Sequence, residues 1–310
     1  MRRNLETFWV RTTRRRLLAR PWELRKHGVL GINRRNIEYL FSLNARRLYG
    51  LVDDKIITKS LCAEIGVPVP QTYAVINRFG AFKALAATIG QREEFVVKPA
   101  RGSAGRGILI IVGRDGGNLR TANGETISLN DLKYHVSTSL SGLYSLGGRP
   151  DRVLVERRIV LHPAFENLAV GGTPDVRIIV FRGEPVMAML RLPTKASRGR
   201  ANLHQGAAAA GIDLDTGTTF GGVCCNRATT IHPDTGAAID GVSIPYWSRM
   251  LEIAGSVSRA VKMGYLGVDI VLDDNHGPLL LEANARPGLS IQIANRCGLL
   301  PRLQSARAQW

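Results

Sequence analysis

Apolar and polar residues in the first half of the chain are arranged in short stretches that predict alternating helices and strands. A helix is expected over residues 55–65, where it ends at a glycine and a proline-rich break, and a strand over 71–76 follows. A second helix is expected over 81–90. Apolar runs at 95–98 and 108–112 predict two strands on either side of a glycine-rich stretch.

The second half of the chain is predicted to be richer in strands. Residues 114–150 hold many Gly, Ser and Asn residues and are expected to form loop with one helix. Strands are predicted over 153–160, 176–181 and 186–192, and a helix over about 245–263 precedes a last strand pair. This order of elements predicts an α+β protein in which antiparallel hairpins carry the polar residues.

The last strand pair flanks a polar turn that we place between Asn275 and His276. Asp269 then falls opposite Glu282, and Asn284 lies two residues on, facing the same side. Two carboxylates that face each other in apolar surroundings are destabilising as a bare pair. We therefore expect a divalent cation there, because Asp, Glu and Asn supply the hard oxygens that Mg²⁺ prefers. The alternative is an acidic pair that faces solvent.

A second group of residues combines Lys98, at the end of a predicted strand, with the loop Gly102-Ser103-Ala104-Gly105-Arg106-Gly107. Glycines let backbone N–H groups surround an anion, and a lysine adds a point charge for phosphate. The loop joins two strands, whereas a dinucleotide-binding fingerprint opens a helix, and it lacks the ending of a Walker loop. These features predict a phosphate site that includes Gly102, Ser103, Gly105 and Gly107. A plain flexible turn is the alternative.

A third group contains Asp175 and Arg177, which share one face of a predicted strand. A structural ion pair between them is one interpretation. Arg200, Asn202 and His204 follow in a stretch with many hydrogen-bond donors, which fits stabilisation of the charge on a transferred phosphate. The three groups together predict phosphoryl transfer.

Other enzyme classes are not supported, because the chain has neither a Gly-x-Ser-x-Gly elbow nor a His-Glu-x-x-His zinc motif. The four cysteines, Cys62, Cys224, Cys225 and Cys297, contain no Cys-x-x-Cys and are expected to be free thiols. The sequence has neither a run of eighteen apolar residues nor a secretory signal. We expect a cytoplasmic protein, with peripheral contact to a membrane left open.

The formal net charge of +17 is concentrated at the start of the chain. Residues 1–50 hold 13 Lys and Arg against 3 Asp and Glu, a net of +10, while the other 260 residues hold 29 against 22, a net of +7. Short helices with basic faces are expected there, and they could contact an anionic surface, either a nucleic acid or a membrane. The other interpretation is a helical cover packed on the main domain. The basic and aromatic residues of this segment include Phe8, Trp9, Arg14, Arg15, Arg16, Trp22, Arg35 and Arg46.

The order of these motifs resembles that of the ATP-grasp ligases over about residues 50–300. The sequence looks most similar to the α-L-glutamate ligase-like branch, which is related to the ribosomal-protein glutamate ligases. Part of the pattern also resembles the sugar-transfer-associated ATP-grasp group. The resemblance is carried by Asp54-Lys55, Val97-Lys98-Pro99 with the glycine loop, Val155-Glu156-Arg157-Arg158-Ile159, Asp175-Val176-Arg177, Asn202-Leu203-His204, Gly267-Val268-Asp269 and Glu282-Ala283-Asn284-Ala285-Arg286-Pro287-Gly288.

The resemblance implies an ATP-grasp fold, in which two α+β lobes hold ATP between them. Lys98, with Lys55 as a weaker candidate, would contact the ATP phosphates beneath the glycine loop. Glu156, Arg157 and the backbone near Ile159 would form the adenine hinge between the lobes.

The resemblance assigns the remaining nucleotide contacts to the C-terminal lobe. Asp175 would lie near the ribose, with Arg177 beside it. Arg200 would face the γ-phosphate and the acyl phosphate, with Asn202 and His204 lining the same cleft.

The resemblance also implies that Asp269, Glu282 and Asn284 hold Mg²⁺ and that Arg286 holds a substrate carboxylate. The expected activity is ligation of a carboxylate, which is either glutamate or another acid, to an amine acceptor through an acyl phosphate. An ATP-grasp kinase is one alternative. A non-catalytic protein that binds nucleic acid or a membrane surface is another.

The expected organisation is a basic helical segment (1–50), an N-terminal lobe with the phosphate loop (51–150), a C-terminal lobe with the Mg²⁺ site (151–300) and a tail (301–310). The basic segment stands where the glutamate ligases usually carry an α/β domain. That domain helps to form the substrate side of the cleft, so glutamate specificity does not follow from the resemblance.

Overall fold

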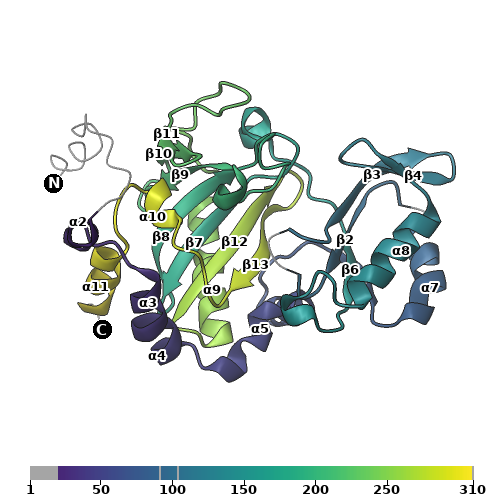
Figure 1. Ribbon diagram of the computed structural model, residues 1–310, viewed down its shortest axis with the longest axis horizontal. Helices are drawn as coiled ribbons and strands as arrows, with labels where there is room; N and C mark the ends of the chain where they lie inside the picture. The colour runs from purple at the N-terminus through teal and green to yellow at the C-terminus, as the bar shows by residue number, and fades with distance from the viewer. Residues whose placement is uncertain (1–19, 91, 103–104, 309–310) are drawn as a thin grey trace.

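The computed structural model describes residues 20–90, 92–102 and 105–308 (Figure 1). The helices are α2 (Pro21–Lys26), α3 (Ile32–Arg35), α4 (Phe41–Leu43), α5 (Gly50–Asp53), α6 (Lys55–Glu64), α7 (Phe82–Ile89), α8 (Leu129–Leu140), α9 (Trp247–Val261), α10 (Ile291–Ala294) and α11 (Leu300–Ala308). The strands are β1 (Thr72–Ile76), β2 (Phe95–Pro99), β3 (Leu109–Asp115), β4 (Asn118–Thr121), β5 (Thr126–Ile127), β6 (Val153–Glu156), β7 (Asp175–Phe181), β8 (Glu184–Leu192), β9 (Ala208–Ile212), β10 (Thr219–Cys224), β11 (Arg227–Ala228), β12 (Tyr265–Asp273) and β13 (Gly277–Asn284).

Two antiparallel sheets organise the chain, which confirms the predicted α+β class. The N-terminal sheet has the strand order β1-β6-β2-β3-β4-β5, and the C-terminal sheet has the order β11-β10-β9-β8-β7-β12-β13. The two sheets lie side by side with α5 and α6 near the junction between them (Figure 1). In the described part of the chain, no helix is both long and apolar enough to cross a membrane.

Several predicted elements agree with the structure within two residues, among them α6, α7 and α9. Other expectations are wrong. The region 114–150 contains the strands β4 and β5 as well as α8, and the strand predicted over 153–160 ends at Glu156. The strands β9, β10 and β11 were not predicted, and α11 forms where a tail was expected.

Strand alternation gives the N-terminal sheet one apolar and one polar face. Phe95 and Val97 of β2 belong to a buried cluster with residues of α7 and α8, including Leu85 and Leu132. Because neighbouring residues of a strand point to opposite faces, Lys98 lies on the face turned away from these helices. The sheet thus directs its predicted phosphate lysine away from its own core.

The C-terminal sheet is covered on both faces. Ile178 and Val180 of β7 pack in one cluster with residues of α9. Ile179 and Phe181 pack in another cluster with residues of α11 and of the N-terminal segment. The charged residues of β7, Asp175 and Arg177, therefore lie at the start of a strand whose remaining residues are buried on both faces.

The N-terminal segment packs on the C-terminal sheet over the residues that the structure describes. The ring of Tyr39 lies 6.0 Å from that of Phe181 and 5.7 Å from that of Tyr265. The buried Asn44 side chain donates to Tyr265 O at 2.7 Å and to Ala285 O at 3.1 Å. These contacts agree with a helical cover for residues 20–50, whereas residues 1–19, which hold Phe8, Trp9 and Arg14 to Arg16, lie outside the described residues.

Helix α6 connects to both lobes. Asp54 caps its first turn by accepting from Ile56 N at 3.1 Å, a contact typically worth about 1 kcal/mol. Lys55 N donates to Ala100 O in the N-terminal lobe at 3.0 Å, and the segment after the helix accepts from Leu280 N in β13. The predicted free state of the four cysteines is confirmed.

Candidate functional site

The two predicted metal-binding carboxylates face each other on neighbouring strands. Asp269 of β12 pairs with Glu282 of β13, as predicted. The turn is centred on Asn275, half a residue before the predicted centre, because Asp273 pairs with Gly277. An extra residue on β13, Leu281, then shifts the register and brings Asp269 opposite Glu282. The bulge therefore determines that the two carboxylates lie opposite each other.

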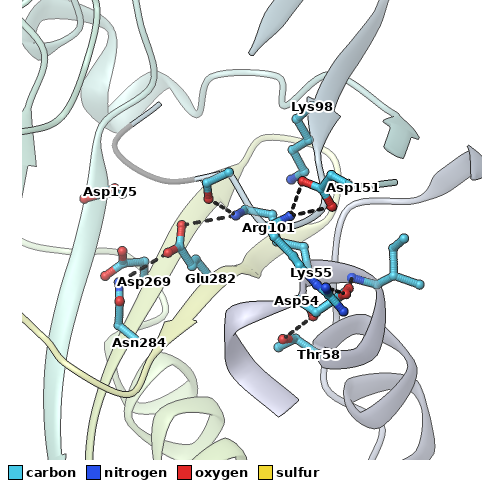
Figure 2. A network of polar contacts seen from close by, with 12 residues as sticks. Asp54, Lys55, Thr58, Lys98, Arg101, Asp151, Asp175, Asp269, Glu282 and Asn284 are labelled. Atoms are coloured by element: carbon cyan, nitrogen blue, oxygen red, sulfur yellow. Dashed lines mark hydrogen bonds and ion pairs between the residues drawn. The ribbon is translucent and has the colours of Figure 1, made fainter. Parts of the chain in front are cut away.

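Asn284 completes the predicted metal set. Its Nδ2 donates to Glu282 Oε1 at 3.3 Å, and the side chains of Asp269, Glu282 and Asn284 lie close together in Figure 2. Asp269 is buried, whereas the Glu282 side chain keeps 33% of its surface exposed. Glu282 is therefore accessible to a further ligand from the space between the lobes.

Two arginines from neighbouring strands neutralise Asp269. Arg177 of β7 contacts it with two nitrogens, Nε lying 2.6 Å from Oδ1, and Arg191 of β8 places Nη2 2.9 Å from Oδ2. Arg191 also donates to both oxygens of Asp175. The interpretation of Asp175 and Arg177 as one ion pair is therefore wrong. Each residue instead pairs with its cross-strand neighbour, where opposite charges attract.

The arginines keep Asp269 ionised in spite of its burial. Burial alone raises the pKa of Asp269, but the charges of Arg177 and Arg191 outweigh it and lower the pKa to about 2. Burial dominates at Asp175, whose pKa rises to about 6 in spite of Arg191. Asp269 is thus held in the carboxylate form, which is the form that binds a cation. Arg191 was not predicted, although an arginine within an apolar run was a signal that could have found it.

Lys98 occupies the polar face of the N-terminal sheet, where it is buried and forms an ion pair with Glu156 of β6. Lys59 of α6 contacts the other carboxylate oxygen of Glu156. Burial raises the pKa of Glu156, but the two lysines outweigh this effect, so that the net shift is downward. Glu156 therefore holds two cationic side chains at the edge of the N-terminal lobe. Lys59 was not predicted.

Lys55 connects the phosphate loop to the metal candidates. Its Nζ donates to Gly102 O at 2.9 Å and lies 3.9 Å from Glu282 Oε2. At the start of α6, Asp54 accepts from Arg101 Nε at 3.0 Å, and Figure 2 shows this pair beside Lys55. The loop, the first turn of α6 and the metal candidates are thus adjacent.

The glycine loop adopts backbone angles that favour glycine. Gly105 and Gly107 have φ values of +71° and +72°. A Cβ atom on Gly107 would lie 2.5 Å from the ring of Tyr144, and one on Gly105 would lie 3.6 Å from the side chain of Arg200. The loop therefore reaches Arg200, which belongs to the other lobe. Ser103 lies outside the described residues.

Arg200, Asn202 and His204 lie in the connection between β8 and β9. Arg200 and His204 are exposed. Asn202 Oδ1 accepts from His204 N at 3.0 Å and caps a short 3-10 turn at Leu203–Gln205. The Asn202 oxygen thus has a structural contact, whereas Arg200 extends toward the glycine loop.

The predicted adenine hinge follows β6. Arg157 N donates to Gln71 O at 2.9 Å, and its guanidinium lies 2.9 Å from a carboxylate oxygen of Asp273. Ile159 makes no backbone hydrogen bond to any described residue. Since the Glu156 side chain faces the two lysines, the Ile159 backbone is better placed than that side chain to bind a ligand at the hinge.

Arg286 lies two residues beyond Asn284, next to the N-terminal segment. Its Nη2 is 2.8 Å from an oxygen of Asp53, and its guanidinium lies 4.8 Å from the ring centre of Tyr49. The predicted substrate arginine is therefore near the metal candidates in sequence but faces the N-terminal segment.

Residues 34–308 match the sequence profile of the sugar-transfer associated ATP-grasp family. The chain belongs to this family. The expected ATP-grasp fold is confirmed, and of the two related groups named above it is the sugar-transfer-associated one whose profile matches. A comparison with curated proteins finds no match.

Among solved structures, the chain is similar to the ATP-grasp ligase PsnB complexed with a minimal precursor, with 15% identity and a TM-score of 0.45. This likeness covers 86% of the chain but 62% of PsnB, which is less than two thirds of its length. D-cycloserine synthetase DcsG is similar with 15% identity and a TM-score of 0.48, over 85% of this chain and 72% of that one. The D-alanine–D-alanine ligase from Bacillus anthracis, complexed with ATP, has 16% identity and a TM-score of 0.44, over 84% and 62% of the two chains.

The donor set fits Mg²⁺ held between protein and phosphate. The described residues contain no group of three or more His, Cys, Asp or Glu side chains that could hold a metal. Two carboxylates and one amide are present, and Mg²⁺ commonly completes such a set with water and substrate phosphates. Lys55, whose Nζ lies 3.9 Å from Glu282 Oε2, adds positive charge beside this donor set.

Proposed function

We propose that this protein is an ATP-dependent ligase that joins a carboxylate to an amine through an acyl phosphate, with Mg-ATP bound between the lobes. The observation that carries the proposal is the position of Lys55, which contacts the glycine loop and also lies 3.9 Å from Glu282, the strand partner of Asp269. Cations for phosphate and ligands for Mg²⁺ thus meet at one junction. Membership of an ATP-grasp family supports the choice of nucleotide.

The carboxylates have distinct tasks in this proposal. Asp269 and Glu282 would hold Mg²⁺ with Asn284, and the bound ion supplies charge neutralisation at the phosphates. Arg177 and Arg191 orient Asp269 and keep it ionised. Glu282 is half-buried, so in this proposal it lies on the side of the metal site where water and nucleotide phosphates can exchange as ligands.

The cationic side chains act on the phosphates. Lys55 and Lys98 supply positive charge from the N-terminal lobe, and Arg200 supplies it from the C-terminal lobe, where charge develops on the transferred phosphoryl group. Lys98 is paired with Glu156, so its charge is oriented before the nucleotide binds. A developing charge is stabilised most effectively by groups that are already in place.

The position of Gly105 beside the Arg200 side chain suggests a further role for the glycine loop. A loop that lies on Arg200 covers the position where phosphate is transferred and excludes water from it. Exclusion of water matters because an acyl phosphate is hydrolysed readily.

The test is ADP release from Mg-ATP with pairs of carboxylates and amines, starting with glutamate as the acid. Sustained ADP release with formation of an amide should require both substrates, and ¹⁸O placed in the carboxylate should appear in the released phosphate. Glu282→Ala should abolish turnover, while Glu184→Ala, which alters an exposed carboxylate at the start of β8, should keep it. A stable phosphate ester formed without any amine, in place of an acyl phosphate that hydroxylamine traps, would contradict ligation and identify a kinase.

A further inference from the structure

A basic pocket adjoins the proposed Mg-ATP site on the side of the N-terminal segment. It has a volume of about 540 Å³. A second pocket of about 410 Å³ shares Arg46, Tyr49 and Arg286 with the first, so the two are adjacent. We call the two together the arginine pocket, after their lining residues Arg35, Arg46, Arg101, Arg149 and Arg286.

The acidic residues of the arginine pocket are already paired. Asp53 contacts Arg286, and Asp54 contacts both Arg101 and Arg152. The five lining arginines outnumber these two carboxylates, so the pocket carries a positive charge.

Two arginines of the pocket are without such partners. The side chains of Arg46 and Arg149 make neither a hydrogen bond nor an ion pair with any residue that the structure describes, and both are exposed. Arg46 comes from the N-terminal segment and Arg149 from the N-terminal lobe. Their charges are therefore available to a ligand that enters between these two parts of the chain.

The walls of the pocket are held in place by contacts outside it. Asp151 accepts from Arg101 N at 3.0 Å and from Ser145 Oγ at 2.6 Å. Arg35 donates to Pro287 O at 2.8 Å, which fixes it beside the strand that carries Glu282. The pocket is thus built before a ligand binds.

The pocket opens next to the proposed reaction centre. Arg286 follows Asn284 by two residues, and Arg101 precedes Gly102, whose carbonyl accepts from Lys55. A molecule that is anchored by the arginines would extend its free end toward the Asp269–Glu282 pair.

We propose that the arginine pocket binds the substrate of this enzyme and that this substrate is an acidic small molecule, with a phosphate or a carboxylate in addition to the group that reacts. Guanidinium groups recognise both oxyanions through paired hydrogen bonds. The volume of about 540 Å³ lies within the usual range for small-molecule sites. The N-terminal segment therefore supplies the substrate side of the cleft through Arg35 and Arg46. This inference rests on the proposed function.

The experiment uses the full chain with Mg²⁺ and a saturating amount of the ATP analogue AMPPNP. Glucose 6-phosphate and glutarate are titrated by calorimetry as the phosphate and dicarboxylate probes, with glucose as the uncharged control. Arg46→Gln/Arg149→Gln is the pocket variant. Arg47→Gln/Arg227→Gln, which alters two exposed arginines outside both pockets, is the matched control.

One acidic probe should bind the wild type and the control variant, while glucose should not bind. Its Kd should rise about tenfold in the pocket variant, equivalent to ~1.4 kcal/mol. The preferred probe identifies the oxyanion as phosphate or carboxylate. The absence of binding for both acids, or equal Kd values in the two variants, overturns the proposal. Binding of a single-stranded RNA oligonucleotide in place of both probes overturns it as well.

The nucleotide titration in the same samples separates the two proposals. If one AMPPNP binds per chain but the pocket variant binds the acid as well as the wild type does, the proposed nucleotide site is supported and the proposed arginine pocket is refuted. The protein could instead bind the acid through the pocket arginines without binding AMPPNP. That result would contradict the proposed ligase function. It would show that the pocket is an anion site without a role in ligation.

Discussion

Replacement of Arg191 by methionine tests the charged cluster of the C-terminal lobe. Arg191 is 9% exposed and binds both oxygens of Asp175 as well as one oxygen of Asp269. Methionine keeps an unbranched apolar stem, shorter than that of arginine, and removes the charge, which leaves Asp175 buried without the cationic partner that it contacts. Removal of one member of a buried ion pair typically destabilises a protein by about 3–5 kcal/mol.

The corresponding shift in melting temperature follows from the size of the chain. For 310 residues that unfold together, the entropy of unfolding is roughly 0.65 kcal/mol per degree. A loss of ~3–5 kcal/mol therefore lowers Tm by about 5–8 °C. Arg177→Met should cost less, because Arg191 would still contact both Asp175 and Asp269.

Thermal unfolding followed by circular dichroism at neutral pH is the assay. The double variant Arg191→Met/Asp175→Asn should recover part of the lost stability, because the uncompensated carboxylate is removed. If Arg191→Met lowers Tm no more than Arg177→Met, or if Asp175→Asn brings no recovery, the reasoning about the cluster is refuted.

Three further predictions concern the loop, the N-terminal lobe and the N-terminal segment. Gly107→Ala should cost roughly 2 kcal/mol more than Gly124→Ala, because both have positive φ but only the first would clash with Tyr144; equal Tm values would contradict this. Glu156 has a lowered pKa, so its stabilising contribution is complete above its ordinary value of 4.5 and is lost as the pH falls. The difference in Tm between wild type and Glu156→Gln should therefore shrink as the pH falls below about 4.5, and a difference that stays constant in this range would be inconsistent with it. Asn44→Ala should cost about 2 kcal/mol and speed tryptic cleavage of residues 20–50; unchanged cleavage would argue against the packing described here.

The sequence was most informative where local pattern and chemistry agree. The hairpin of β12 and β13 shows strand periodicity, a polar turn and three candidate oxygen ligands within sixteen residues of sequence. The pairing of Asp269 with Glu282 could therefore be predicted, although the bulge at Leu281 that produces it could not. A bulge depends on how the whole strand packs, and a one-residue register shift carries no local signal of its own.

Elements that depend on distant partners were missed. The run from Ala207 to Ala210 has high helix propensity, yet β9 is a buried strand between β8 and β10. Small residues are required there, because a Cβ on Gly211 would lie 2.7 Å from Phe220 and 3.0 Å from Asn295. Close tertiary packing thus overrides propensity.

The partners of the site residues were the other omission. Arg191 neutralises two carboxylates and Lys59 pairs with Glu156, but neither stands in a recognisable motif. Both are placed by strand order or by helix docking, which sequence spacing does not reveal. The arginine pocket likewise joins residues from three separate parts of the chain.

The central claim is that Mg²⁺ and ATP bind together between the lobes. Isothermal titration of the wild type with AMPPNP, with and without Mg²⁺, tests it most directly when it is repeated with Glu282→Ala. The account predicts one nucleotide per chain, binding that strengthens with Mg²⁺, and loss of this strengthening in the folded variant. Binding that is equal with and without Mg²⁺, or that is unchanged in Glu282→Ala, would contradict the assignment of the Asp269–Glu282 pair.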